Sequence, residues 1–137
     1  MNNLISGDLA EEIDYDRQPR ASPARPQVAS IGLTEQQCED RGIAFKKGIF
    51  PFAADGKAVI VGETEGLAKV ITDAAMDAVL GVHSIGTSVT DLIAEAAVAM
   101  TLAATSREIG ATTRPHPTLS EVLGEAALAV DGQRINS

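Results

Sequence analysis

The chain has 137 residues and a formal net charge of −8, from 19 acidic and 11 basic side chains. Hydrophobic residues make up 45% of it but aromatic residues only 3%, so small aliphatic side chains must form the core of a single domain. This balance argues against nucleic acid and anionic membranes as partners. No apolar run has the length of a membrane span, and the N-terminus lacks the composition of a signal peptide, so we expect a cytoplasmic protein.

Residues 1–26 are predicted to form an N-terminal arm or linker before a domain at 27–137. The stretch from Arg17 to Pro26 contains three arginines and three prolines. Proline fixes φ and has no amide hydrogen, so this composition disfavours helices and central strands. We therefore expect an extended, polyproline II chain here.

The first part of the domain is predicted to contain mostly strands. A short strand is expected at 28–32, followed by a helix that begins with a capping box of Thr34 and Gln37 and ends near Gly42. Further strands are expected at 44–50, 58–61, 67–72 and 78–85, because these segments are rich in β-branched or aromatic residues between Gly, Asp or Pro. The interval 73–77 is short enough for a hairpin loop, which makes the last two strands antiparallel neighbours.

Helices are predicted in the second half of the chain. The segment 91–104 is almost entirely small or apolar, with Asp91, Glu95 and Thr101 as its polar positions. Such a helix must be buried on nearly every face, so we expect it to contact a second subunit as well as the sheet. A short helix capped by Thr105 and Glu108 and an alanine-rich helix at 119–130 complete the prediction. The fold class is α+β, an antiparallel sheet of about five strands with helices packed on one face.

Few residues are candidates for chemistry, because the chain has two histidines and one cysteine. His83 lies in a predicted strand and is interpreted as a hydrogen-bonded structural histidine. Cys38 has no second cysteine for a disulfide and is interpreted as structural. Neither histidine has ligand-type residues at the spacing of a metal site, so no metal is predicted. The remaining candidate is His116, which precedes Glu121 by five residues.

Two interpretations of Glu121 are open. Thr118 and Glu121 have the spacing of a capping box at the start of a helix. Alternatively, Glu121 pairs with His116 as a histidine–carboxylate dyad for acid–base chemistry. The two can coexist, because the helix start fixes Glu121 while Pro117 stiffens the backbone beside His116.

The run from His116 to Glu121, HPTLSE, resembles the C-terminal signature of dihydrolipoamide dehydrogenase, a flavin-dependent member of the pyridine nucleotide-disulfide oxidoreductases. Other stretches agree with it in the same order, at 26–34, 50–54, 62–66, 80–83 and 91–97, although Arg25 stands where these enzymes have a histidine. The chain has neither a glycine-rich dinucleotide fingerprint nor a cysteine pair. The resemblance therefore implies the dimerisation domain of such an enzyme, without its FAD, NAD or disulfide sites.

The resemblance also implies a role for the candidate pair. In such enzymes this domain forms a homodimer and offers a His–Glu pair to the flavin and disulfide site of the other subunit. His116 would be the base that takes a proton from a dihydrolipoyl thiol, and Glu121 would orient its ring. The complete enzyme would use FAD and NAD and serve a lipoyl-bearing complex, whereas this chain alone, with no cofactor site of its own, is expected to be inactive. Two alternatives remain: a stand-alone interaction protein that pairs with a full-length relative, and an unrelated small-molecule enzyme that reuses the dyad.

Overall fold

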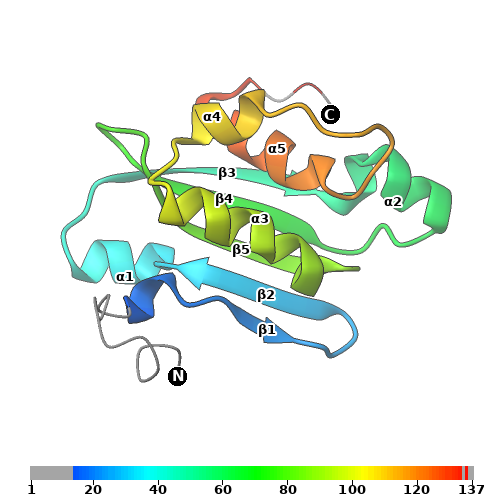
Figure 1. The fold of residues 1–137 in the computed structure, drawn as a ribbon, viewed down its shortest axis with the longest axis horizontal. Coiled ribbons are helices and arrows are strands. Elements are labelled where there is room, and N and C mark those ends of the chain that lie inside the picture. The colour runs from blue at the N-terminus through cyan, green and yellow to red at the C-terminus, as the bar shows by residue number, and fades with distance from the viewer. Residues whose placement is uncertain (1–13, 134, 136–137) are drawn as a thin grey trace, which may run out of the picture.

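A computed structural model of the chain describes residues 14–133 and 135. Within these residues, five strands form one antiparallel sheet in the order β1-β2-β5-β4-β3 (Figure 1). The strands are β1 (Arg20–Ser22), β2 (Gln27–Gly32), β3 (Phe45–Pro51), β4 (Leu67–Asp73) and β5 (Val79–Gly86). The helices are α1 (Glu35–Asp40), α2 (Gly56–Val61), α3 (Val89–Thr101), α4 (Ser106–Ala111) and α5 (Glu121–Leu128). The predicted α+β fold with a five-stranded antiparallel sheet is confirmed.

Two kinds of local prediction, the hairpin and the helix caps, are also confirmed. The hairpin loop joins β4 and β5 as antiparallel neighbours. Complete capping boxes begin α1, with Thr34 and Gln37, and α4, with Thr105 and Glu108. No helix in the described part of the chain is long and apolar enough to cross a membrane.

The strand predicted at 58–61 is wrong, because these residues form α2. The carboxylate of Asp55 accepts a hydrogen bond from the Ala58 amide at 2.8 Å, which caps the helix start. Gly62 ends the helix in the left-handed region, with φ of 74°. Capping at both ends thus outweighs the strand preference of the apolar residues 59–61, whose side chains stay exposed.

The edge strand β1 lies in the range that was predicted to be an arm. Arg20 pairs with Ser30 and Ser22 with Val28, at the edge of the sheet. An edge strand tolerates neighbouring prolines, because one row of its amides has no partner strand. The sheet therefore begins before residue 27, and the first part of the predicted arm, residues 1–13, lies outside the described residues.

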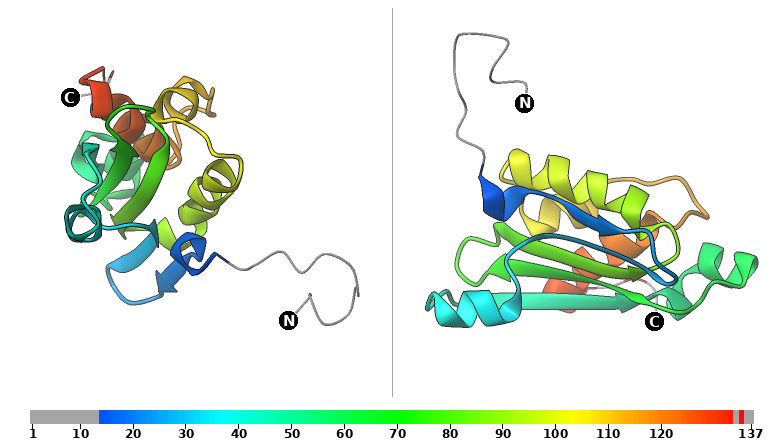
Figure 2. Two further views of the ribbon diagram at one scale, coloured as in Figure 1. Left: turned by 90° about the vertical axis from the view of Figure 1, so that its left-hand side faces the viewer. Right: turned by 90° about the horizontal axis from the view of Figure 1, so that it is seen from below.

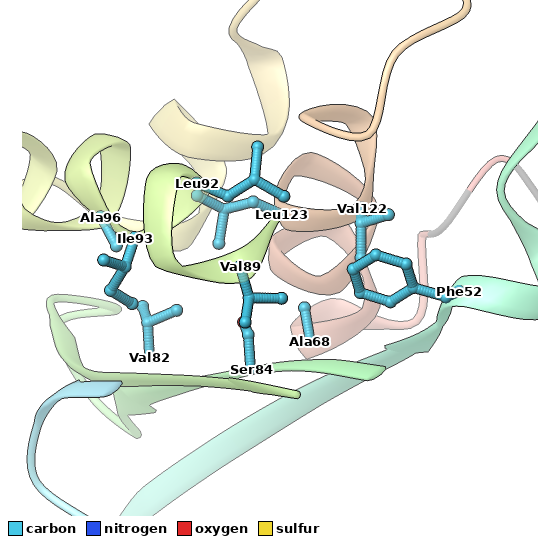
Figure 3. Close-up of a pocket in the computed structure, with 10 residues that line it drawn as sticks. All are labelled: Phe52, Ala68, Val82, Ser84, Val89, Leu92, Ile93, Ala96, Val122 and Leu123. Atoms are coloured by element: carbon cyan, nitrogen blue, oxygen red, sulfur yellow. The ribbon is translucent and has the colours of Figure 1, made fainter. Parts of the chain in front are cut away.

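Most of the core lies between one face of the sheet and the helices α3 and α5 (Figure 2). Figure 3 shows how Phe52, just after β3, lies beside Val122 at the start of α5, while Ile93 of α3 lies above Val82 of β5. The shorter α1 covers one end of the opposite face, where Leu33, Cys38 and Ile71 are buried. The prediction of helices on one face thus describes α3 and α5, and α1 adds a small second layer.

The helix α5 lies unusually close to β3 at Gly48. A Cβ atom at this position would overlap the backbone of Ala126 and Val130. Six consecutive residues of α5, Val122–Ala127, are buried. The backbone of this helix is therefore fixed against the sheet, and so is its first residue, Glu121.

Candidate acid–base site

His116 lies in the loop between α4 and α5, and Glu121 begins α5. The His116 side chain is 76% exposed, whereas that of Glu121 is 21% exposed. The peptide bond between His116 and Pro117 is cis. The structure thus places an exposed imidazole beside a carboxylate that is largely enclosed and belongs to a buried helix.

The two side chains are hydrogen bonded. His116 Nδ1 lies 2.9 Å from Glu121 Oε1 and 3.2 Å from Oε2. An ionised carboxylate only accepts, so Nδ1 carries the hydrogen and donates it. In the neutral ring Nε2 then keeps its lone pair. The pair can therefore orient a proton acceptor on the surface of the domain, with the carboxylate ready to stabilise the protonated ring.

The same carboxylate also takes part in the start of α5. Glu121 Oε2 accepts a hydrogen bond from the Thr118 amide at 2.9 Å, as in a capping box. The other half of the box is missing, because α5 begins after Ser120 without a side-chain cap. The Thr118 hydroxyl donates instead to the Pro115 carbonyl at 2.7 Å. Glu121 thus bonds both the Thr118 amide in the turn before α5 and the ring of His116, while the acid–base role of the pair stays a prediction.

The charges around the pair favour an ionised Glu121. Burial raises the pKa of its carboxyl, but the hydrogen bonds from Thr118 and His116 and the positive charge of Arg114 outweigh this effect and lower it overall. Asp55 is a further acidic group near the site. Burial raises its pKa, the hydrogen bond from Ala58 opposes this, and the charge of Glu121 raises it further.

Sequence reasoning did not identify Arg114 as part of this site. Its side chain is only 8% exposed and forms an ion pair with Glu95 of α3. Arg114 lies 19 positions after Glu95 in the chain, so no local pattern signals the contact.

The other predicted residues lie elsewhere. His83 Nε2 lies 2.9 Å from the Leu33 carbonyl oxygen, which confirms a hydrogen-bonded histidine, and burial lowers its pKa. Cys38 is a buried free cysteine, and burial raises the pKa of its thiol, which disfavours the reactive thiolate. In residues 14–133 and 135, no cluster of three His, Cys, Asp or Glu side chains is arranged to hold a metal ion.

At several helix N-termini of the described residues, a backbone amide that could bind a phosphate is already hydrogen bonded within the chain. Thr34, Asp55 and Thr105 cap α1, α2 and α4 with their own side chains. At α3, the Thr90 amide donates to Gln27 Oε1 at 3.2 Å. The glutamate at the start of α5 would repel a phosphate.

Comparison with known proteins identifies the domain. Residues 19–127 match the family described as the pyridine nucleotide-disulphide oxidoreductase dimerisation domain. The chain belongs to this family. The resemblance inferred from the HPTLSE run is thereby confirmed.

The relatives of this dimerisation domain include dihydrolipoyl dehydrogenases. The Bacillus subtilis protein of that name is 50% identical over 118 residues, which cover 86% of this chain and 25% of the relative. Dihydrolipoyl dehydrogenase 3 of Pseudomonas putida is 49% identical over 121 residues, which cover 88% of this chain and 26% of the relative. The chain thus spans about a quarter of the length of the curated relatives it matches.

Two solved structures share the fold of this dimerisation domain. LpdA from Mycobacterium tuberculosis superimposes with a TM-score of 0.82 at 22% identity, over 88% of this chain and 26% of the other. The HOCl-induced flavoprotein disulfide reductase RclA from Escherichia coli superimposes with a TM-score of 0.80 at 21% identity, over 92% and 29%. The sheet and its helices are therefore an arrangement that occurs within larger chains.

Proposed function

We propose that this chain is the dimerisation domain of a dihydrolipoyl dehydrogenase and that His116 and Glu121 are its acid–base pair. The identity of about half with dihydrolipoyl dehydrogenases, over most of the chain, supports the first part. One observation carries the second: His116 is 76% exposed, yet its Nδ1 is hydrogen bonded to a carboxylate fixed at the start of a buried helix. Such a bond fixes which ring nitrogen stays free, as the function of a general base requires.

The proposed step is a proton transfer from a dihydrolipoyl thiol to Nε2 of His116. The S–H bond breaks, its electron pair stays on sulfur as a thiolate, and a new N–H bond forms on the imidazole. Glu121 stabilises the resulting imidazolium and holds the ring in the tautomer that leaves Nε2 free. FAD and NAD, which would carry the electrons in the complete enzyme, bind outside this chain in our proposal. The chain alone is therefore expected to show no oxidoreductase activity.

The proposed partner is a second copy of the same subunit. Val98 and Leu102, at the end of α3, are apolar side chains that are 61% and 75% exposed. They add to the surface of small, apolar side chains along α3, and such a surface suits a symmetric contact between two helices. In the complete enzyme, a lipoyl-bearing complex would supply the dithiol. The alternative, a stand-alone interaction protein that pairs with a full-length relative, would use the same surface.

The test is to mix this chain with a dihydrolipoyl dehydrogenase from which the C-terminal domain has been removed. We expect partial recovery of dihydrolipoamide–NAD activity, and light scattering should show the two chains associated. His116→Gln should abolish most of the recovery and leave association intact, because an amide cannot accept the thiol proton. Glu63→Gln, a change at an exposed residue away from the pair, is the control. Equal recovery with wild type and His116→Gln would refute the acid–base role and leave a scaffold.

A further inference from the structure

Arg114 enters the loop two residues before His116, and its guanidinium is enclosed by three helices. The side chain is 8% exposed, although it belongs to a connection between helices. Nη1 donates hydrogen bonds to the carbonyl oxygens of Ile109, at 3.0 Å, and Thr112, at 2.9 Å, at the end of α4. Nη2 pairs with the carboxylate of Glu95 on α3. The start of the loop is thus bonded to two helices at once.

The same guanidinium packs against the third helix, α5, at Gly124. A Cβ atom built at position 124 would overlap Nη1 and Cζ of Arg114. The guanidinium therefore lies against a part of α5 that has no side chain, one turn after Glu121. A single residue connects α3, α4 and α5 beside the candidate pair.

The position of His116 depends on the backbone that carries it, since the ring itself is mostly surrounded by solvent. On the C-terminal side, the loop is fixed by Thr118, whose amide donates to Glu121 and whose hydroxyl donates to the Pro115 carbonyl. On the N-terminal side, the bonds of Arg114 fix the loop to the ends of the helices. These two sets of bonds hold the backbone on both sides of His116.

We propose that Arg114 is a positioning residue, which holds the loop so that His116 Nδ1 stays at the carboxylate of Glu121. A guanidinium suits this task because its planar fork donates in several directions at fixed angles. Lysine would keep the charge but could not reproduce the bonds to Ile109, Thr112 and Glu95 together. The catalytic consequence of this role rests on the proposed function, whereas the positioning itself can be measured in this chain alone.

The first experiment measures hydrogen exchange of the Thr118 amide by NMR in the 137-residue chain. In Arg114→Gln and Arg114→Lys we expect the exchange to accelerate at least about tenfold, because the loop opens more often. The His116 ring signals should shift toward those of an unpaired imidazole. Arg107→Gln on α4 removes the same charge from an exposed side chain and is the matched control, with unchanged exchange.

Unchanged Thr118 exchange in both Arg114 variants would overturn the proposal. If Arg114→Gln fails to fold, Glu95→Gln and Gly124→Ala make the same test. The first weakens a single bond, and the second displaces the guanidinium while its charge remains. Wild-type exchange in these two variants would then overturn the proposal, and faster exchange in a folded protein would support it.

The second experiment uses the mixture with the shortened dehydrogenase. Arg114→Gln should lower kcat of the recovered activity about tenfold and leave KM for dihydrolipoamide within about twofold, because a misplaced base slows the chemical step. If wild type recovers no activity, the proposed function fails, and the exchange experiment still decides the positioning role. Full recovery with Arg114→Gln would overturn the positioning role while the proposed function stands.

Discussion

Replacing Glu121 with glutamine removes the charge at the centre of the candidate site but nearly keeps its size. The Thr118 amide and His116 Nδ1 both lose an ionised acceptor, and the single carbonyl oxygen of glutamine can serve only one of them well. Hydrogen bonds to charged groups contribute about 1.5–3 kcal/mol each when enclosed. His116 is 76% exposed here, so solvent reduces the effect, and we expect a loss of about 1 kcal/mol in the free energy of unfolding.

The loss should depend on pH in a defined direction. The pKa of Glu121 is lowered in the folded domain. The stability that the ionised group contributes is therefore present above the unfolded carboxyl pKa and is lost as pH falls through the folded one. The difference in the free energy of unfolding between wild type and Glu121→Gln should be complete at about pH 7 and should shrink toward about pH 3.

Urea unfolding followed by circular dichroism at both pH values measures this difference. Glu63→Gln serves as the control, because it makes the same chemical change at an exposed residue. Equal stability of wild type and Glu121→Gln at neutral pH would show that the bonds to Glu121 contribute nothing. A difference of the same size at both pH values would show that the charge is not its cause.

Three further predictions follow from the packing. Gly48→Ala should destabilise the domain by about 2 kcal/mol or more in thermal unfolding, because its new methyl group overlaps the α5 backbone; an unchanged melting temperature would contradict this contact. Asp55→Ala should lose about 1 kcal/mol with the α2 cap. Asp55→Asn keeps an acceptor for the cap and should be at least as stable as wild type at about pH 7. The pKa of Asp55 is raised in the folded domain, so ionisation of its carboxyl lowers the stability as pH rises through the folded-state pKa; a less stable Asn variant would refute this. Val98→Lys should dissociate a homodimer without unfolding the domain, since the Val98 side chain is 61% exposed in the single chain. Met100→Lys should unfold the domain, because Met100 is only 4% exposed. A monomeric wild type in light scattering would refute the proposed α3 contact.

Predictions from sequence succeeded where all interacting groups lie within a few residues. The capping boxes at Thr34 and Thr105 have both partners in one turn of chain, so the local sequence contains the whole interaction. The contact between His116 and Glu121 is equally local, since only a short turn separates the two hydrogen-bonded side chains, and its acid–base role stays a prediction. The HPTLSE run also pointed to the family, which the match at residues 19–127 bears out.

Predictions failed where neighbouring signals competed. Residues 58–61 have the composition of a strand, but Asp55 and Gly62 cap them as a helix, and their apolar side chains stay exposed on it. The strand β1 lies among prolines, and it forms because β2 supplies a partner for Arg20–Ser22 along one edge. Composition describes which secondary structure a segment prefers in isolation. That preference amounts to about 1 kcal/mol or less per residue, so pairing or capping with a few neighbours can outweigh it.

The surroundings of the site depended on tertiary structure alone. Arg114 is an ordinary loop residue in the sequence, and its partner Glu95 belongs to another helix. Gly124 has no special spacing either, and its missing side chain matters only because α5 packs beside the guanidinium. The chain therefore determines the candidate pair and the helix caps locally. Whether the pair is held in place depends on how α3, α4 and α5 come together over the sheet, since bonds between distant residues form only when the packed helices bring their ends into contact.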